Sequence, residues 1–113
     1  MGHTISEKIL ASHCGKRDVY PGEIVTCDVD LLMMNELGAA LSIETFNELG
    51  IEDVFDPDKI TIVTDHFVPS KDIVAAEHVK LSKEFCETHG IEKFFSIGKM
   101  GIEHVILAEQ GLI

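Results

Sequence analysis

The sequence predicts an α/β fold, a layered αβα arrangement with a small parallel or mixed sheet. Stretches of helical periodicity alternate with short apolar stretches rich in β-branched residues, in the order helix, strand, helix, strand, helix, strand. Gly15, Gly50 and Gly90 follow the three helical stretches, as is typical of helix ends. The chain has 113 residues, 45% hydrophobic and 26% charged, which indicates one folded domain or part of one.

The first 30 residues predict a helix, a turn and a strand. The helix is expected to begin after Thr4, because Thr4-Ile5-Ser6-Glu7 matches a capping box. Tyr20-Pro21-Gly22-Glu23 predicts a turn, since proline fixes the first central angle and glycine permits the second. Apolar and polar residues alternate over residues 24–30, which predicts a strand.

The middle of the chain predicts a second helix and then a buried strand. The helix is expected from Ala39 to Gly50, and Asn35-Glu36 before it has the composition of a loop with a helix cap. An acidic connector follows. The β-branched run in residues 60–63 predicts a buried strand.

The last third predicts the longest helix and another short strand. The helix is expected from Ser70, as its cap, to about His89. The stripe that faces the core is expected to contain Val74, His78, Leu81 and Phe85, because these residues follow helical spacing. A short strand is expected within residues 91–97.

Asp65 and His66 are the strongest candidates for a functional site. They follow the buried strand directly, and ligands of open α/β sheets collect at the carboxyl ends of strands. A carboxylate beside an imidazole fixes its tautomer and keeps it basic. On the residues alone, the pair is either a fragment of an active site or a loop pair that only caps the next helix.

Charge and cysteine content exclude several classes of function. Twenty acidic and nine basic residues give a net charge of −11, which repels nucleic acids and anionic membranes. No signal peptide or membrane span is encoded, so a cytoplasmic location is expected. Cys14, Cys27 and Cys86 are widely spaced and are expected to be small buried residues, so no metal or cluster site is predicted from them.

A series of segments, taken in order, resembles the large subunit of 3-isopropylmalate dehydratase and its relatives in the aconitase superfamily, including homoaconitase. The resemblance covers essentially the whole chain. The segments that carry it are Thr4 to Leu10, Pro21 to Val25, Asp30-Leu31, Asp56 to Ile60, Asp65 to Pro69, and Gly101 to His104 with Leu107, Glu109 and Gly111.

The resemblance implies a hydro-lyase of leucine biosynthesis. Such enzymes reversibly remove water from hydroxy-di- or tricarboxylic acids such as 3-isopropylmalate, using a [4Fe-4S] cluster and commonly a small partner subunit. The resemblance makes Asp65, His66 and His104 catalytic positions and places Asn35 and Glu36 on a substrate-side loop. For Asp65 and His66 a functional role is favoured, because the family motif and their position at the end of a strand agree. The family's cluster cysteines are not in these 113 residues, which are therefore expected to be an inactive N-terminal fragment, a single α/β piece of an aconitase-type N-terminal domain.

Two departures from the family pattern leave the substrate open. Many relatives have His-Asp or His-Glu where this chain has Asn35-Glu36, and Gln is usual at Val105. For Asn35 and Glu36 a structural role is slightly favoured, and for His104 a packed setting is equally natural. Two alternatives stay open for the whole chain: a stand-alone, non-catalytic α/β binding or assembly module derived from the family, or a metal enzyme with Asp65, His66 and His104 as ligands.

Overall fold

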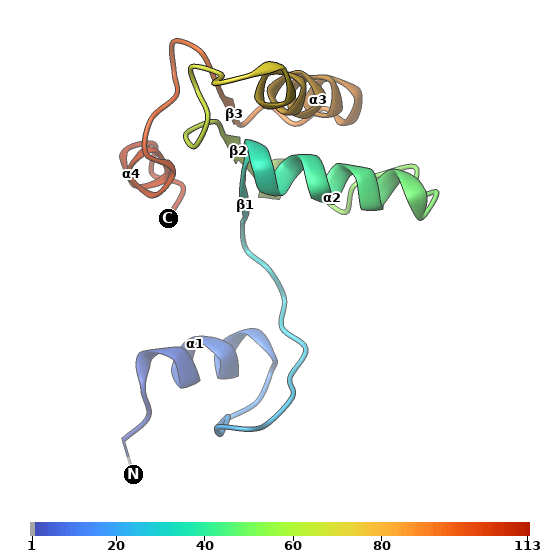
Figure 1. The fold of residues 1–113 in the computed structure, drawn as a ribbon. Coiled ribbons are helices and arrows are strands. Elements are labelled where there is room, and N and C mark those ends of the chain that lie inside the picture. Colours follow the sequence, from blue (N-terminus) through green and yellow to red (C-terminus); the bar gives the residue numbers. More distant parts are fainter. Residues whose placement is uncertain (1) are drawn as a thin grey trace. The chain divides into compact units, whose positions relative to one another are not determined.

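The computed structural model describes residues 2–113, which divide into two compact units (Figure 1). The first unit extends to Asp30 and the second is Leu31–Ile113. The expectation that the chain forms one piece of a larger subunit's domain stays a prediction.

The first unit is built on helix α1, Ile5–His13. The predicted capping box is confirmed: the Thr4 side chain accepts a hydrogen bond from the Glu7 amide, and the Glu7 carboxylate accepts one from the Thr4 amide. The predicted turn is also confirmed, because the Glu23 amide donates to the Tyr20 carbonyl at 3.1 Å. Short-range signals therefore determine most of this unit.

The strand predicted over residues 24–30 is wrong. These residues are irregular, and Ile24 is 97% exposed. The Asp28 amide donates to the His13 carbonyl at 2.8 Å, which ties this segment to α1 of the same unit. Alternation alone does not make a strand, because a strand needs a neighbouring strand to pair with, and the pairing stretch begins only at Leu32.

The second unit confirms the predicted α/β fold, with a three-stranded sheet that is entirely parallel in the order β1-β2-β3. Each crossover between neighbouring strands contains one helix, α2 or α3. A short 3-10 turn precedes β2, and helix α4, which was not assigned from the sequence, follows β3. The elements are β1 (Leu32–Asn35), α2 (Glu36–Glu48), η1 (Pro57–Lys59), β2 (Ile60–Val63), α3 (Ile73–His89), β3 (Phe94–Phe95) and α4 (Glu103–Glu109).

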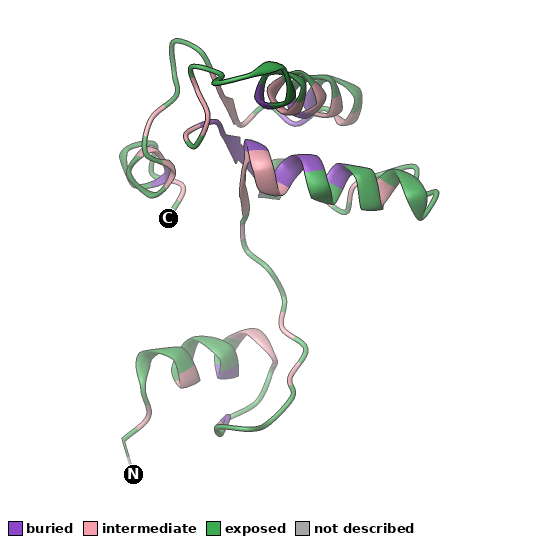
Figure 2. Ribbon diagram, in the orientation of Figure 1, coloured by how far each residue is buried: buried purple, intermediate pink, exposed green. Residues whose placement is uncertain are grey.

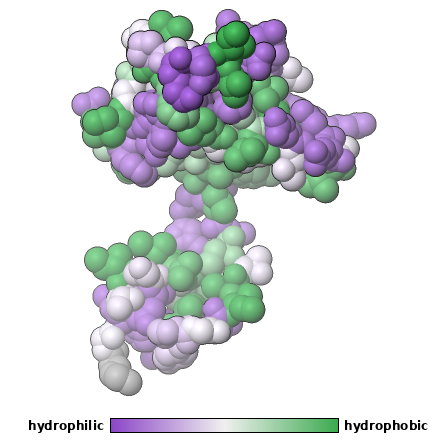
Figure 3. Space-filling view, in the orientation of Figure 1, coloured by the Kyte–Doolittle hydropathy of each residue, from purple (hydrophilic) through white to green (hydrophobic). Residues whose placement is uncertain are grey.

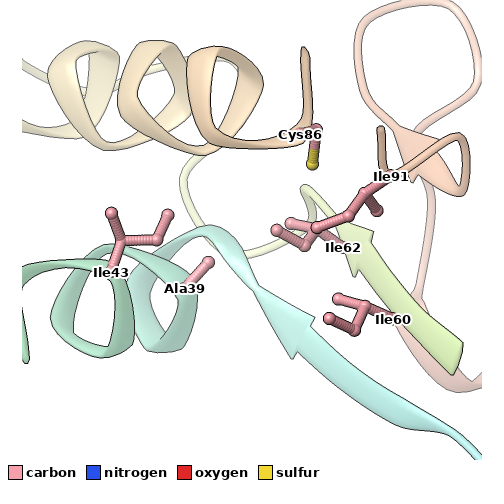
Figure 4. Packing of buried hydrophobic residues seen from close by; sticks show 6 residues of the cluster. All are labelled: Ala39, Ile43, Ile60, Ile62, Cys86 and Ile91. Atoms are coloured by element: carbon pink, nitrogen blue, oxygen red, sulfur yellow. The ribbon is translucent and has the colours of Figure 1, made fainter. Parts of the chain in front are cut away.

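The central strand β2 forms the middle of the hydrophobic core. All four of its residues are buried, as expected for the middle strand of a parallel sheet (Figure 2). Ile60 and Ile62 pack with Ala39 and Ile43 of α2, and the same cluster includes Cys86 of α3 and Ile91 (Figure 4). The two helices also contact each other. The core therefore fixes both helices against the strand that carries the site.

The starts of two helices differ from the prediction. Helix α2 begins at Glu36 rather than Ala39, because the Asn35 side chain caps it. Helix α3 begins at Ile73 with Asp72, not Ser70, as its cap, and the Asp72 carboxylate accepts from the Ala75 amide at 2.8 Å. Of the predicted core-facing stripe, Leu81 and Phe85 pack against the core, whereas Val74 is 56% exposed. The fully buried residues of α3 are Ala75, Ser82 and Cys86.

The cysteines are only partly as expected. Cys86 is 3% exposed, and burial raises the pKa of its thiol to about 11. Cys14 and Cys27 are half-buried, so the expectation that all three are buried is wrong. Burial, and then the neighbouring Cys14 thiol, raise the pKa of Cys27. These two thiols lie together because residues 10–14 and 27–28 are hydrogen-bonded to each other.

Apolar side chains also lie on the surface. Figure 3 shows hydrophobic atoms scattered among hydrophilic ones in each unit. Ile97, for example, is 82% exposed and Ile73 is 77% exposed. Within residues 2–113, no helix combines the length and apolar character that crossing a lipid bilayer requires.

Candidate active site

Parallel pairing places the ends of the three strands at one edge of the sheet. Asn35 at the end of β1 lies opposite Val63 of β2, and Val63 lies opposite Phe95 of β3. The Thr64 amide continues the pairing by donating to the Phe95 carbonyl at 2.9 Å. Residues just after β1 and β2 are therefore neighbours, which brings Glu36 close to Asp65.

Glu36 binds the backbone of the segment that follows β2. Its Oε2 accepts a hydrogen bond from the Asp65 amide at 3.0 Å, and its Oε1 accepts one from the Phe67 amide at 2.5 Å. The Glu36 side chain has 0% of its surface exposed. The first residue of α2 thus holds the segment on either side of His66.

Asp65 joins His66 to the start of α4. The Asp65 Oδ1 atom pairs with His66 Nδ1. Its Oδ2 atom accepts a hydrogen bond from the Glu103 amide at 3.0 Å. The Asp65 side chain is 13% exposed and that of His66 is 45% exposed, so the carboxylate lies inside and the imidazole reaches the surface. Pairing through Nδ1 leaves Nε2 as the nitrogen that is free to exchange a proton with a substrate.

The surroundings of His66 favour its protonated form. The hydrogen bond to Asp65 is the main reason that the pKa of His66 is raised above its ordinary value. Partial burial acts in the opposite direction, while the charges of Asp65, Glu103 and Glu36 raise this pKa further. A histidine with a raised pKa carries a proton at neutral pH more often than a free one does, which suits it to act as a general acid.

Glu103 is a member of the site that the sequence did not indicate. Its amide binds Asp65, its charge acts on His66, and its side chain is 14% exposed. Its buried Oε2 atom has no hydrogen-bond partner within the described residues. Its only signal in the sequence is its place in the Gly101-Ile102-Glu103-His104 segment, beside the histidine that the resemblance marks as catalytic.

His104 and Asn35 have other surroundings. The His104 side chain is 71% exposed, and its Nε2 lies 3.6 Å from Glu103 Oε1. Among the contacts described for residues 2–113, none joins His104 to Asp65 or His66. The Asn35 Oδ1 atom accepts from the Leu37 and Gly38 amides at 3.1 and 2.9 Å, which is the capping role favoured from the sequence. The catalytic role of His104 and the substrate-binding role of Asn35 stay predictions.

The donor atoms at this edge also form the pattern of a metal site. Glu36, Asp65 and His66 each offer a ligand atom, and these atoms lie within 4.8 Å of one another. However, both oxygens of Glu36 and both oxygens of Asp65 already take part in hydrogen bonds. The partner of Asp65 Oδ1 is the His66 imidazole itself. The internal hydrogen bonds therefore account for the cluster without an ion.

The cysteines of this chain do not fit an iron–sulfur cluster. Such a cluster needs several thiolates that point at one place. Cys86 is packed in the core with Ile62 and Ile91 and has no room for a cluster beside it. Cys14 and Cys27 are the remaining two of the three cysteines, and two thiols do not make a complete ligand set.

An apolar hollow of about 260 Å³ lies away from the candidate site. It contains Leu32 and Ile60, at the starts of β1 and β2, together with Phe46, Phe55 and Phe85. None of the residues that line it has a titratable side chain. This hollow therefore offers no acid–base group, whereas Asp65 and His66 lie beyond the opposite end of β2.

Taken together, the second unit has a hydrogen-bonded carboxylate–imidazole pair at the end of its central strand, an arrangement that suits general acid–base chemistry. Comparison with known proteins gives the family that the chain resembles. The chain is 53% identical over 113 residues to the 3-isopropylmalate dehydratase large subunit of Hydrogenobaculum sp., and 49% identical over 113 residues to that of Thermodesulfovibrio yellowstonii. It is also 53% identical over 112 residues to large subunit 1 of Pyrococcus furiosus.

The chain is therefore homologous over its whole length to the 3-isopropylmalate dehydratase large subunit, of the aconitase-type hydro-lyases, and the resemblance seen in the sequence is confirmed. It spans about a quarter of the length of these relatives, 26% or 27% in each case, which agrees with an N-terminal portion. No protein-family model matches the chain.

Proposed function

We propose that this chain supplies a proton-donating pair, Asp65 and His66, to a hydro-lyase that removes water from a hydroxy-diacid such as 3-isopropylmalate and adds it back. The observation that supports this most strongly is the Asp65 carboxylate, which pairs with Nδ1 of a surface-reaching imidazole while a backbone amide holds its other oxygen. The names of the relatives supply the reaction class and the substrate.

The pair suits the difficult part of a dehydration, which is the loss of hydroxide from carbon. Hydroxide is a poor leaving group, so the oxygen needs a proton as the bond breaks. Protonated His66 delivers it from Nε2, and Asp65 stabilises the imidazolium through Nδ1. In the reverse direction neutral His66 takes a proton from water. The charges of Glu36 and Glu103 favour the protonated state between turnovers.

The proposal places the chain in a larger, cytoplasmic enzyme with a small partner subunit and a [4Fe-4S] cluster. When bound, the cluster supplies an iron that acts as a Lewis acid on the substrate. Its ligands come from other parts of the enzyme, because the described cysteines do not form a cluster site. Asn35 and His104 remain candidates for substrate contact and proton transfer in that setting.

A chimera tests this proposal. Residues 1–113 replace the matching segment of the Hydrogenobaculum large subunit, to which they are 53% identical. The chimera is co-expressed with the small subunit of the same organism and assayed for conversion of 3-isopropylmalate to the unsaturated diacid, which absorbs in the ultraviolet. The chimera is expected to be active, whereas residues 1–113 alone are expected to show no activity.

Two outcomes contradict the proposal. One is a folded, cluster-loaded chimera without activity, since the segment then does not supply a working pair. The other is water elimination by residues 1–113 alone, since the reaction then does not depend on a cluster from elsewhere. The native Hydrogenobaculum enzyme, prepared in the same way, is the positive control.

A further inference from the structure

We propose that Glu36 is a positioning residue, which holds the Asp65–His66 pair in place by binding the backbone on both sides of His66. This inference rests on the proposed function of that pair. It differs from the substrate-binding role that the resemblance implied for Glu36, and it gives this buried carboxylate a task that needs no contact with substrate.

The geometry is that of a clamp with two points of attachment. The two oxygens of Glu36 accept hydrogen bonds from the Asp65 and Phe67 amides, at 3.0 and 2.5 Å, so that His66 lies between the two bound residues. Two bonds to residues on either side restrict both the position and the rotation of the segment between them. A single bond leaves that rotation free.

Sheet register explains why Glu36 reaches this segment. Parallel pairing of Asn35 with Val63 places the residue after β1 beside the residues after β2. Glu36 is the first residue of α2 and follows β1 directly, while the Asn35 side chain binds the Leu37 and Gly38 amides and not the segment after β2. The clamp thus joins the start of α2 to the segment after β2, since Asp65 and Phe67 lie 29 and 31 residues beyond Glu36 in the sequence.

Burial rules out direct contact with a substrate and explains why the clamp is strong. Glu36 is 0% exposed, and each of its oxygens is occupied by a backbone amide. Burying a carboxylate without a hydrogen-bond partner costs free energy, and so does burying a backbone amide without one. The hydrogen bonds between Glu36 and the two amides avoid both costs. The nearby imidazolium of His66, on which the Glu36 charge acts, supplies a positive charge.

The test is a substitution that keeps the charge and shortens the reach. Glu36→Asp removes one methylene, so a carboxylate at position 36 no longer spans both amides. We expect NMR titration of residues 1–113 to show a downward shift of the His66 midpoint, because Asp65 and His66 lose their fixed alignment. We also expect hydrogen exchange of the Asp65 and Phe67 amides to become roughly tenfold faster or more, as for loss of a charge-assisted bond.

Asn35→Ala is the matched control. It removes the cap of α2 one residue away, where the side chain binds Leu37 and Gly38, and leaves the bonds to Asp65 and Phe67 in place. Asn35→Ala is therefore expected to destabilise the start of α2, where Glu36 also lies, and to leave the His66 midpoint unchanged. A purely structural role of Glu36 predicts that the two variants behave alike.

Glu36→Gln keeps the length and covers the case in which Glu36→Asp does not fold. Its amide has one oxygen and accepts from only one of the two backbone amides, so only the other is expected to exchange faster. The proposal is overturned if the His66 midpoint stays unchanged in Glu36→Asp, or if both amides stay protected in Glu36→Gln. These readouts do not use activity, so they fail or succeed independently of the chimera assay.

Discussion

Replacing Asp65 with asparagine is expected to lower the activity of the chimera by about 10²- to 10⁴-fold, the usual contribution of a positioned general acid. Asparagine has the same shape, and its oxygen still accepts from the Glu103 amide. It has no charge to stabilise the imidazolium, and its NH₂ group, placed against Nδ1, favours the wrong tautomer of His66. The rate of formation of the unsaturated diacid measures the effect.

Asp53→Asn is the control for this substitution, because Asp53 is an exposed acid in the connector before β2. It removes the same charge from the same unit and is expected to keep activity within about twofold. Thermal melts of both chimeras distinguish lost chemistry from lost folding. Nearly full activity in a folded Asp65→Asn chimera contradicts the assigned role of the pair.

Replacing Ile62 with alanine is expected to cost about 2–5 kcal/mol of unfolding free energy. Ile62 is 0% exposed in the central strand and packs in the cluster formed with α2 and α3, so truncation leaves a cavity between three elements. Whole domains are stable by about 5–15 kcal/mol, so this loss is a large share of the total. Urea unfolding followed by far-ultraviolet circular dichroism measures it.

Ile97→Ala provides the comparison within the same unit. Ile97 is 82% exposed, so its truncation is expected to change the unfolding free energy by no more than about 0.5 kcal/mol. If Ile62→Ala costs as little as Ile97→Ala, the packing described around β2 is wrong. The site depends on that packing, because β2 carries Asp65 and His66 at its end.

Local signals account for the parts of the fold that the sequence predicted. The Thr4–Glu7 capping box and the Tyr20–Glu23 turn each depend on residues three apart, and both are present. The buried strand over residues 60–63 was also predicted from local sequence, since four β-branched side chains in a row suit burial on both faces of a sheet. The position of Asp65 and His66 after that strand followed directly.

Long-range pairing accounts for what the sequence did not predict. Residues 24–30 alternate better than 32–35, yet only the latter pair with β2. The register of that pair buries Glu36, which in the sequence looks like an ordinary acid at a helix start. Glu103 joins the site because its amide meets Asp65 across 38 residues. No local pattern contains such information.

The most direct test of the account is an NMR titration of His66 in residues 1–113, with the ring nitrogens labelled. The hydrogen bond to Asp65 predicts a pKa for His66 above the ordinary value of about 6.5, with Nδ1 carrying the proton in the neutral form. Because the folded pKa is raised, the stability that the pair contributes is full below the unfolded pKa and is lost as pH rises through the folded pKa. A midpoint at or below the ordinary value, or a neutral form protonated at Nε2, contradicts the account.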